Sequence, residues 1–183
     1  RPRKPQGRMN VLNVHERPLA VDPVRVGELL DALASPQDTL WPRQIWPEMR
    51  FDGPLSVGAV GGHGPIRYTV ETWKPGEAIW FRFTSPEGFH GGHGFEVLPL
   101  VEEGALLRHT LRMRAVGSAR LTWPLLFRPL HDALIEDALA QAEASLGLPP
   151  FTRPWSARVR VLRWLVARGR PRPWRPPSPP SGD

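Results

Sequence analysis

The sequence predicts an α+β domain with an antiparallel sheet of about six strands and a long C-terminal helix. Two short helices are expected after the first strand. Three observations predict this architecture. Strand-like segments separated only by turn sequences occupy the middle of the chain. A long helical pattern, 119–146, follows them, and one strand and one helix precede them.

The first elements are a strand and a helix. Residues 10–17 roughly alternate between apolar and polar side chains, which is typical of a strand. Asp22 and Pro23 then begin a helix, because aspartate caps free N–H groups and proline suits the first helical position. This helix ends near Ala34. Residues 37–49 are expected to form a loop or the second short helix.

The middle of the chain is expected to be an antiparallel meander. Turn sequences rich in glycine and proline separate its strands, and no helical pattern lies between them. The expected strands are 49–52, 66–74, 78–84, 93–99 and 105–115.

The long helix contains a proline in its interior. Pro129 should kink the helix, at about 3 kcal/mol if nothing compensates. The helix could therefore begin near Pro129 instead, with 119–128 as a separate piece. Gly147 and the prolines that follow it end the helix.

Charge divides the chain into three parts. The net charge is +6, yet residues 9–148 hold twelve basic and seventeen acidic side chains. Residues 1–8 are a basic N-terminal extension. Residues 149–183 are a basic, proline-rich tail with eight arginines and a short helix expected at 155–168. Since 9–148 is mildly acidic, no specific nucleic-acid partner is expected.

Composition and hydropathy indicate the cellular compartment in which the protein is expected. The chain has no cysteine, which removes disulfides and thiolate metal sites and fits a reducing compartment. No uninterrupted apolar run has the length of a signal sequence or a membrane span. A cytoplasmic protein is therefore expected.

Several short segments, taken in order, resemble a known superfamily. They are Val14-His15-Glu16-Arg17, Leu40-Trp41-Pro42, Gly61 to Tyr68, Trp73-Lys74-Pro75-Gly76 and Leu130-His131-Asp132-Ala133-Leu134. Over about 9–148 they resemble bacterial members of the START, Bet v 1 and polyketide cyclase-dehydrase superfamily, SRPBCC. The resemblance implies the helix-grip fold, in which a curved sheet wraps around the long C-terminal helix and leaves a cavity between them. Members bind lipids, sterols, hormones or polyketides, and some cyclise or dehydrate polyketides, so the fold names no substrate.

Strand alternation predicts which side chains face this cavity. The face without charges should point inward, and side chains of the helix region should complete the lining. Core packing is the competing interpretation for each residue. The predicted ligand-binding residues are Tyr68, Phe81, Phe83, His93, Phe95, His109, Leu111, Met113, Trp123, Phe127 and His131.

Three polar residues of this set are candidates for acid–base chemistry: His93, His109 and Tyr68. An inward histidine could hydrogen-bond a ligand oxygen or move a proton near neutral pH. A buried histidine that bonds a backbone carbonyl is the commoner case.

No metal site and no cofactor are expected. Gly-Gly-His-Gly occurs at 61–64 and at 91–94, and His90 lies three residues before His93, but no acidic residue accompanies these histidines at a ligand spacing. Two tight turns are the expected role of the glycines. The glycine-rich 58–64 lacks the order of a nucleotide-binding loop.

Three functions follow from these features. The leading hypothesis is a carrier of a hydrophobic small molecule, lipid or polyketide-like, in the cavity. The second is a cyclase- or dehydrase-like enzyme that uses an inward histidine or tyrosine; whether the protein is an enzyme stays open, with a non-enzyme favoured. The third is a protein that acts through its tail, where arginines and tryptophans of 153–175 would contact an anionic membrane weakly.

Overall fold

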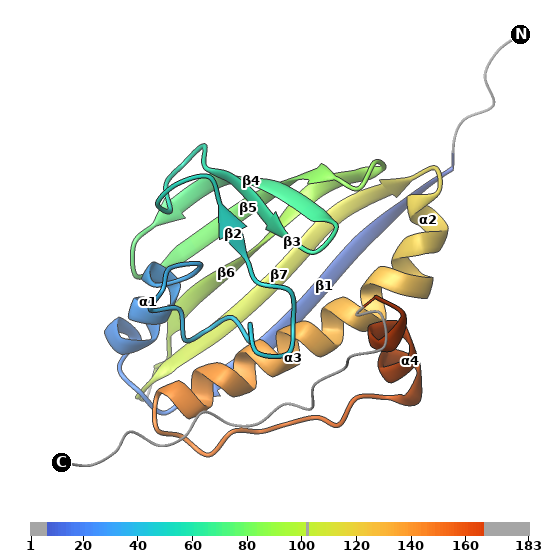
Figure 1. The fold of residues 1–183 in the computed structure, drawn as a ribbon. Coiled ribbons are helices and arrows are strands. Elements are labelled where there is room, and N and C mark those ends of the chain that lie inside the picture. The colour runs from blue at the N-terminus through green and yellow to red at the C-terminus, as the bar shows by residue number, and fades with distance from the viewer. Residues whose placement is uncertain (1–6, 102, 167–183) are drawn as a thin grey trace, which may run out of the picture.

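A computed structural model describes residues 7–101 and 103–166. Seven antiparallel strands form one curved sheet in the order β1-β7-β6-β5-β4-β3-β2 (Figure 1). The strands are β1 (Arg8–Leu19), β2 (Arg50–Phe51), β3 (Val60–His63), β4 (Ile66–Lys74), β5 (Ala78–Ser85), β6 (Phe89–Pro99) and β7 (Ala105–Val116). The first strand pairs with the last, from Arg8 opposite Val116 to Leu19 opposite Ala105. The predicted fold class is confirmed.

Helices cover the concave face of this sheet. They are α1 (Pro23–Asp31), α2 (Ala119–Thr122), the π-helical turn η1 (Trp123–Phe127), α3 (Arg128–Ser145) and α4 (Ala157–Val166). In Figure 1, α3 runs across the opening of the sheet and α4 lies beside it. None of the described helices is long and apolar enough to cross a membrane.

The alternation predicted for the strands holds in the structure. Charged residues such as Arg82 and Arg112 point outward and are exposed. The eight strand residues predicted to point inward are all buried: Tyr68, Phe81, Phe83, His93, Phe95, His109, Leu111 and Met113. Apart from His93 and His109, they form one hydrophobic core with side chains from α1, α3 and the β1–β2 connection.

The two Gly-Gly-His-Gly segments lie largely in strands and not in the two expected tight turns, although Gly64 at the end of the first belongs to the turn between β3 and β4. The first contributes to β3, a strand that was not predicted, and the second lies inside β6, which begins at Phe89 instead of residue 93. Glycine has a low strand propensity, so pattern alone points to a loop. Close packing explains its presence here. A methyl group at Gly92 would lie 2.1 Å from the carbonyl oxygen of Phe81 and 2.8 Å from the indole nitrogen of Trp80.

The tryptophan-rich segment 37–49 forms turns and not the second short helix. Asp38 determines its path. Its carboxylate accepts hydrogen bonds from the backbone N–H groups of Ala34, Leu40 and Trp41. A side chain that satisfies these donors competes with helix formation.

Pro129 does not divide the long helix, which is helical from Ala119 to Ser145. The π-helical turn η1 accommodates the proline, because the N–H of Arg128 donates to the carbonyl of Trp123, five residues earlier in the chain. The carbonyl of Pro124 loses its usual helical partner because Arg128 bonds Trp123 instead, and the carbonyl of Leu125 loses its partner because Pro129 has no N–H. The guanidinium of Arg158 donates to both, at 3.2 Å and 2.6 Å. A residue of the C-terminal segment thus compensates for the proline.

Candidate functional site

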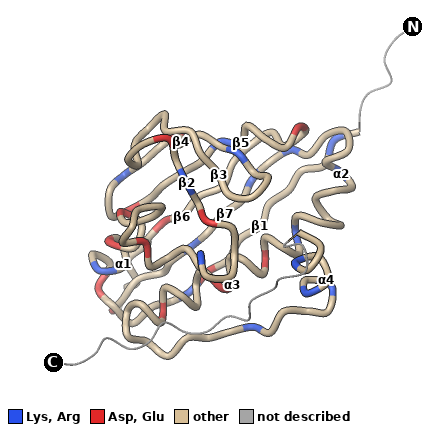
Figure 2. The backbone as a smooth tube through the Cα atoms, viewed as in Figure 1, with Lys and Arg blue, Asp and Glu red and all other residues tan. Residues whose placement is uncertain are grey.

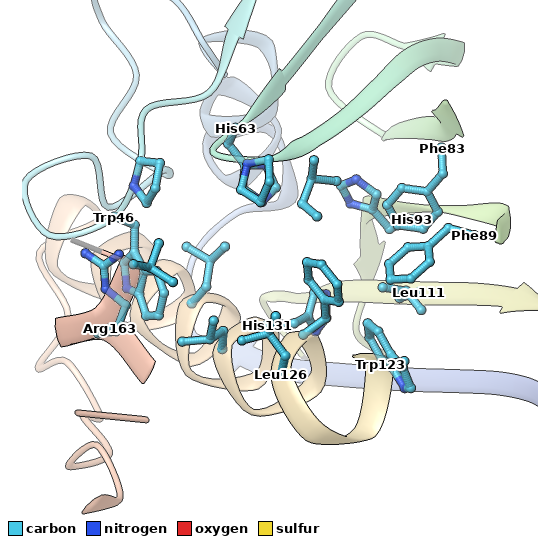
Figure 3. A pocket seen from close by; sticks show the side chains of 17 residues that line it. Trp46, His63, Phe83, Phe89, His93, Leu111, Trp123, Leu126, His131 and Arg163 are labelled. Atoms are coloured by element: carbon cyan, nitrogen blue, oxygen red, sulfur yellow. The ribbon is translucent and has the colours of Figure 1, made fainter. Parts of the chain in front are cut away.

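A cavity of about 280 Å³ lies between the sheet and the η1–α3 helix (Figure 3). Its surface is almost entirely apolar and aromatic. At one end, Phe83, Phe89 and His93 come together, and at the other Arg163 lies against Trp46. The full lining is Trp46, Pro47, His63, Pro65, Ile66, Phe83, Phe89, His93, Leu111, Trp123, Leu126, Phe127, Leu130, His131, Leu134, Arg163 and Val166.

Histidines supply most of the polar groups of the lining. His63 ends β3, and its Nδ1 lies 3.0 Å from the hydroxyl of Tyr68. His93 comes from β6, and its Nδ1 lies 3.2 Å from Nε2 of His109 on β7. In that pair one nitrogen donates and the other accepts, which leaves Nε2 of His93 and Nδ1 of His109 buried without a partner in the described part of the chain. A ligand oxygen could satisfy Nε2 of His93.

These side chains are uncharged at neutral pH. Burial lowers the pKa of His93, His109 and His131 below the usual range, and lowers the pKa of His63 to about 3. Burial also raises the pKa of the Tyr68 phenol well above its ordinary value. The histidine end of the cavity therefore presents neutral hydrogen-bonding groups.

The buried neutral histidines predict sensitivity to acid. An unfolded histidine takes up a proton near pH 6.5, whereas the folded protein keeps His93 neutral well below that. The unfolded state then binds more protons, so the free energy of unfolding should fall from pH 6.5 to 5 by up to about 1.4 kcal/mol per pH unit for each such histidine. Urea unfolding at several pH values measures this slope. His93→Phe should make the slope shallower, and the same slope for His93→Phe and wild type would contradict the prediction. His90→Gln, at an exposed position of the same strand, is the control.

A row of charged side chains joins β1 to α3 beside the cavity. Nδ1 of His15 lies 2.7 Å from Glu136, and Nε2 lies 3.2 Å from Asp132. Arg17 donates to Glu136 at 2.9 Å and to Glu143 at 2.7 Å. Burial opposes the charge of His15, but its hydrogen bonds to Asp132 and Glu136 outweigh this effect and raise the pKa of His15. Burial also opposes the charge of Asp132, but the bonds to His15 and Asn13 and the nearby ring of His131 lower the pKa of Asp132.

The segment after α3 closes the other end of the cavity. The indole N–H groups of Trp46 and Trp155 both donate to Oδ2 of Asp137, at 2.8 Å and 2.9 Å. Arg163 of α4 donates to the carbonyl of Ile45, and its guanidinium lies 4.5 Å from the ring centre of Trp46. Figure 2 shows the blue arginine positions of α4 beside α3.

Six of the eleven predicted ligand-binding residues line the cavity: Phe83, His93, Leu111, Trp123, Phe127 and His131. The other five, Tyr68, Phe81, Phe95, His109 and Met113, are buried behind this lining. Of the three candidate catalytic residues, only His93 reaches the cavity, while Tyr68 and His109 contact histidines that do.

The sequence analysis missed other lining residues, among them His63, Phe89, Trp46 and Arg163. For two of them, Phe89 and His63, the sequence contains a pattern from which their position could have been predicted. Side chains two residues apart in a strand share one face, so extending the alternation of His93 and Phe95 toward the N-terminus places Phe89 on the same face. The two residues Gly64-Pro65 between His63 and Ile66 have the length of a hairpin turn. For Trp46 and Arg163 the sequence carries no signal, because their contacts join distant parts of the chain.

No family model and no curated protein matches the chain. Solved structures do. Norcoclaurine synthase from Thalictrum flavum matches with a TM-score of 0.57 and 13% identity, covering 76% of this chain and 95% of that one. A complex of that enzyme with dopamine and hydroxybenzaldehyde matches with a TM-score of 0.57 and 14% identity, covering 76% and 88%. CalU16 from Micromonospora echinospora matches with a TM-score of 0.52 and 10% identity, covering 90% and 95%.

The chain has the helix-grip fold. At these identities the likeness establishes the fold alone, and it agrees with the Bet v 1-like part of the expected superfamily. The ligand has to be inferred from the cavity itself.

Proposed function

We propose that the protein binds a small, largely apolar molecule that is not a cation, with one oxygen group directed at the histidine end of the cavity. The unpartnered Nε2 of His93 at this apolar cavity carries the proposal. The volume of about 280 Å³ is near the lower end of the roughly 300–1,000 Å³ usual for ligand pockets. A molecule of two or three rings suits it better than a long lipid.

The charge of the lining restricts the ligand further. Arg163 is the only charged side chain among the lining residues if the histidines are neutral, and no acidic residue is among them. An ammonium group would lose its hydration without gaining a counter-charge, which is unfavourable. Dopamine, bound in one of the similar structures, carries an amine. The ligand of this protein should therefore differ in charge from dopamine.

Calorimetry with simple probes tests the proposal. We expect 2-naphthol to bind, and the protonated 2-naphthylmethylamine to bind at least about 10-fold more weakly, because burying its charge costs more than one tenfold step in affinity. Leu126→Trp, which fills the cavity, should weaken 2-naphthol binding by a similar factor. Leu125→Trp is the matched control, since this neighbouring side chain is exposed and absent from the lining. Equal binding by both variants, or preference for the amine, would refute the proposal.

The second candidate is a cyclase- or dehydrase-like enzyme. The unpartnered nitrogen of His93, a residue of the cavity lining, and the contact of His93 with His109 favour it, since a neutral imidazole can accept a proton. The lowered pKa makes His93 a weak base, which favours binding over catalysis. His109→Leu separates the two: a carrier should keep its affinity for 2-naphthol, and an enzyme should lose turnover of a polyketide-like substrate.

Fewer observations support the third candidate, contact with an anionic membrane. Of the four arginines between 153 and 166, Arg153 lies 3.5 Å from Glu136, and Arg158 and Arg163 donate to backbone carbonyls of the domain. In its favour, α4 exposes Trp164 and Leu165. The rest of the predicted stretch, 167–175, lies outside the described residues. Sedimentation with vesicles containing phosphatidylserine tests it, and Trp164→Ser should weaken binding if this contact exists.

A further inference from the structure

We propose that His15, His131 and Asp132 bind a divalent metal ion of the zinc class where β1 meets the start of α3. This site is separate from the proposed ligand site, although His131 also lines the cavity. No metal site was expected from the sequence, in which only the histidines near glycine suggested one. The spacing of His15, His131 and Asp132 along the chain does not show that β1 and α3 bring these three residues together.

The spacing of the three side chains suits a metal ion. One potential ligand atom from each of them lies within 4.8 Å of the others. Nε2 of His15 is 3.2 Å and Nδ1 of His131 is 3.7 Å from Oδ1 of Asp132. Bonds of about 2.0–2.2 Å in a tetrahedral arrangement place ligand atoms about 3.3–3.5 Å apart, so small side-chain movements complete the site.

A second layer of hydrogen bonds orients His15 for this role. Its Nδ1 lies 2.7 Å from Glu136, whose other oxygen accepts from Arg17 at 2.9 Å. If Nδ1 carries the proton, it donates to Glu136, and the lone pair of Nε2 points toward Asp132. A carboxylate that accepts from the outer nitrogen is the usual support of a metal-binding histidine.

An ion pair without metal explains only part of this arrangement. A protonated His15 between Asp132 and Glu136 accounts for the bonds of His15. It leaves both ring nitrogens of His131 and Oδ1 of Asn13 buried without a hydrogen-bond partner within the described residues. A cation bound to His131 would satisfy one of these nitrogens. The amide of Asn13, 2.8 Å from Asp132, stands close enough to supply a fourth ligand if its oxygen and nitrogen exchange places.

The exposure of the three residues also fits an ion that exchanges with solvent. The side chain of Asp132 is 36% exposed, whereas those of His15 and His131 are 12% and 15% exposed. The ion could reach the site along the carboxylate, and a water molecule could occupy a remaining position. Two imidazoles and one carboxylate form a ligand set that suits zinc and its neighbours better than calcium or magnesium.

Zinc titration of the full chain, after dialysis against EDTA, tests the proposal by calorimetry. We expect one Zn²⁺ per chain and a higher melting temperature when Zn²⁺ is present. Asp132→Asn and His131→Leu should each weaken binding by at least about 30-fold, and Glu136→Gln, which changes only the support of His15, by about 10-fold. His90→Gln should bind as wild type does, because this exposed histidine belongs to no group of potential metal ligands among the residues that the structure describes.

Two results would overturn the proposal. One is that wild type binds Zn²⁺ no more tightly than Asp132→Asn, a variant of nearly unchanged shape. The other is that His90→Gln abolishes binding, which would move the metal to the surface. Circular dichroism of each variant without metal verifies folding. If His131→Leu does not fold, two other measurements test the site: Zn²⁺ binding by Asp132→Asn, and the visible absorption spectrum of Co²⁺ bound to wild type. A Co²⁺ spectrum without nitrogen ligation would exclude the site.

Discussion

Replacing Arg17 with methionine should lower the free energy of unfolding by about 3–5 kcal/mol, because it leaves buried carboxylates without their counter-charge. Arg17 and Glu143 are 8% and 7% exposed, and the guanidinium also bonds Glu136 and the carbonyl of Phe151. The change removes all of these bonds at once. Urea unfolding of the metal-free protein, analysed by linear extrapolation, gives the difference.

Arg108→Met provides the matched control for this prediction. Arg108 also bonds two glutamates, Glu16 and Glu96, but on the exposed outer face of the sheet. Exposed ion pairs of this kind contribute about 0–1 kcal/mol. Adding Glu143→Gln to Arg17→Met should restore part of the lost stability, since it removes one buried charge. A similar loss for Arg17→Met and Arg108→Met would show that the inner network contributes no more than a surface pair.

Replacing Asp137 with leucine should destabilise the protein by about 2–4 kcal/mol, since two indole N–H groups lose their acceptor at once. Asp137 is 6% exposed and joins Trp46 of the cavity wall to Trp155 of the C-terminal segment. Burial raises the pKa of its carboxyl, which the two indole bonds partly oppose. The leucine variant should also loosen Arg163, which stacks on Trp46, and hydrogen exchange of residues 157–166 should become faster.

A double-mutant cycle with Trp155→Phe isolates the bond to Trp155. Phenylalanine keeps most of the packing and removes the N–H donor. In the wild-type background this change should be destabilising, because Asp137 loses a bond; in Asp137→Leu it should cost less, because no bond remains. Equal costs in both backgrounds would mean that the hydrogen bond contributes nothing, and that the leucine variant acts through packing alone.

The sheet and its inward face could be predicted because their pattern is local. In β5 and β7 apolar side chains alternate with arginine and threonine, so the inner face that includes Phe81 and Leu111 follows from a period of two. The strand β3 was not predicted because three of the four residues from Gly61 to Gly64 are glycines. Whether such a glycine belongs to a strand depends on the neighbouring strands with which it pairs. Packing against these neighbouring strands places the glycines in the sheet, and this packing cannot be read from the local sequence pattern.

Two contacts, one at the cavity and one beside it, could not be predicted from the sequence for a different reason. Arg163 lies 118 residues from Ile45, whose carbonyl it bonds, and His15 lies 117 residues from Asp132. Neither residue has a local pattern that identifies its partner. The pairing of β1 with β7, followed by the return of the chain along α3, brings His15 to Asp132, and the packing of α4 against α3 brings Arg163 to Ile45.

The bonds from Arg158 to the two carbonyls of η1 also bear on folding during synthesis. Hairpins among β3 to β6 can form as soon as they leave the ribosome, whereas β1 has to wait about 90 residues for β7. The helix that closes the sheet then retains two free carbonyls until Arg158 emerges. Because α4 also supplies Arg163 and Val166 to the cavity lining, we expect the cavity to stay open there until this helix is synthesised, which gives a ligand time to enter before the cavity closes.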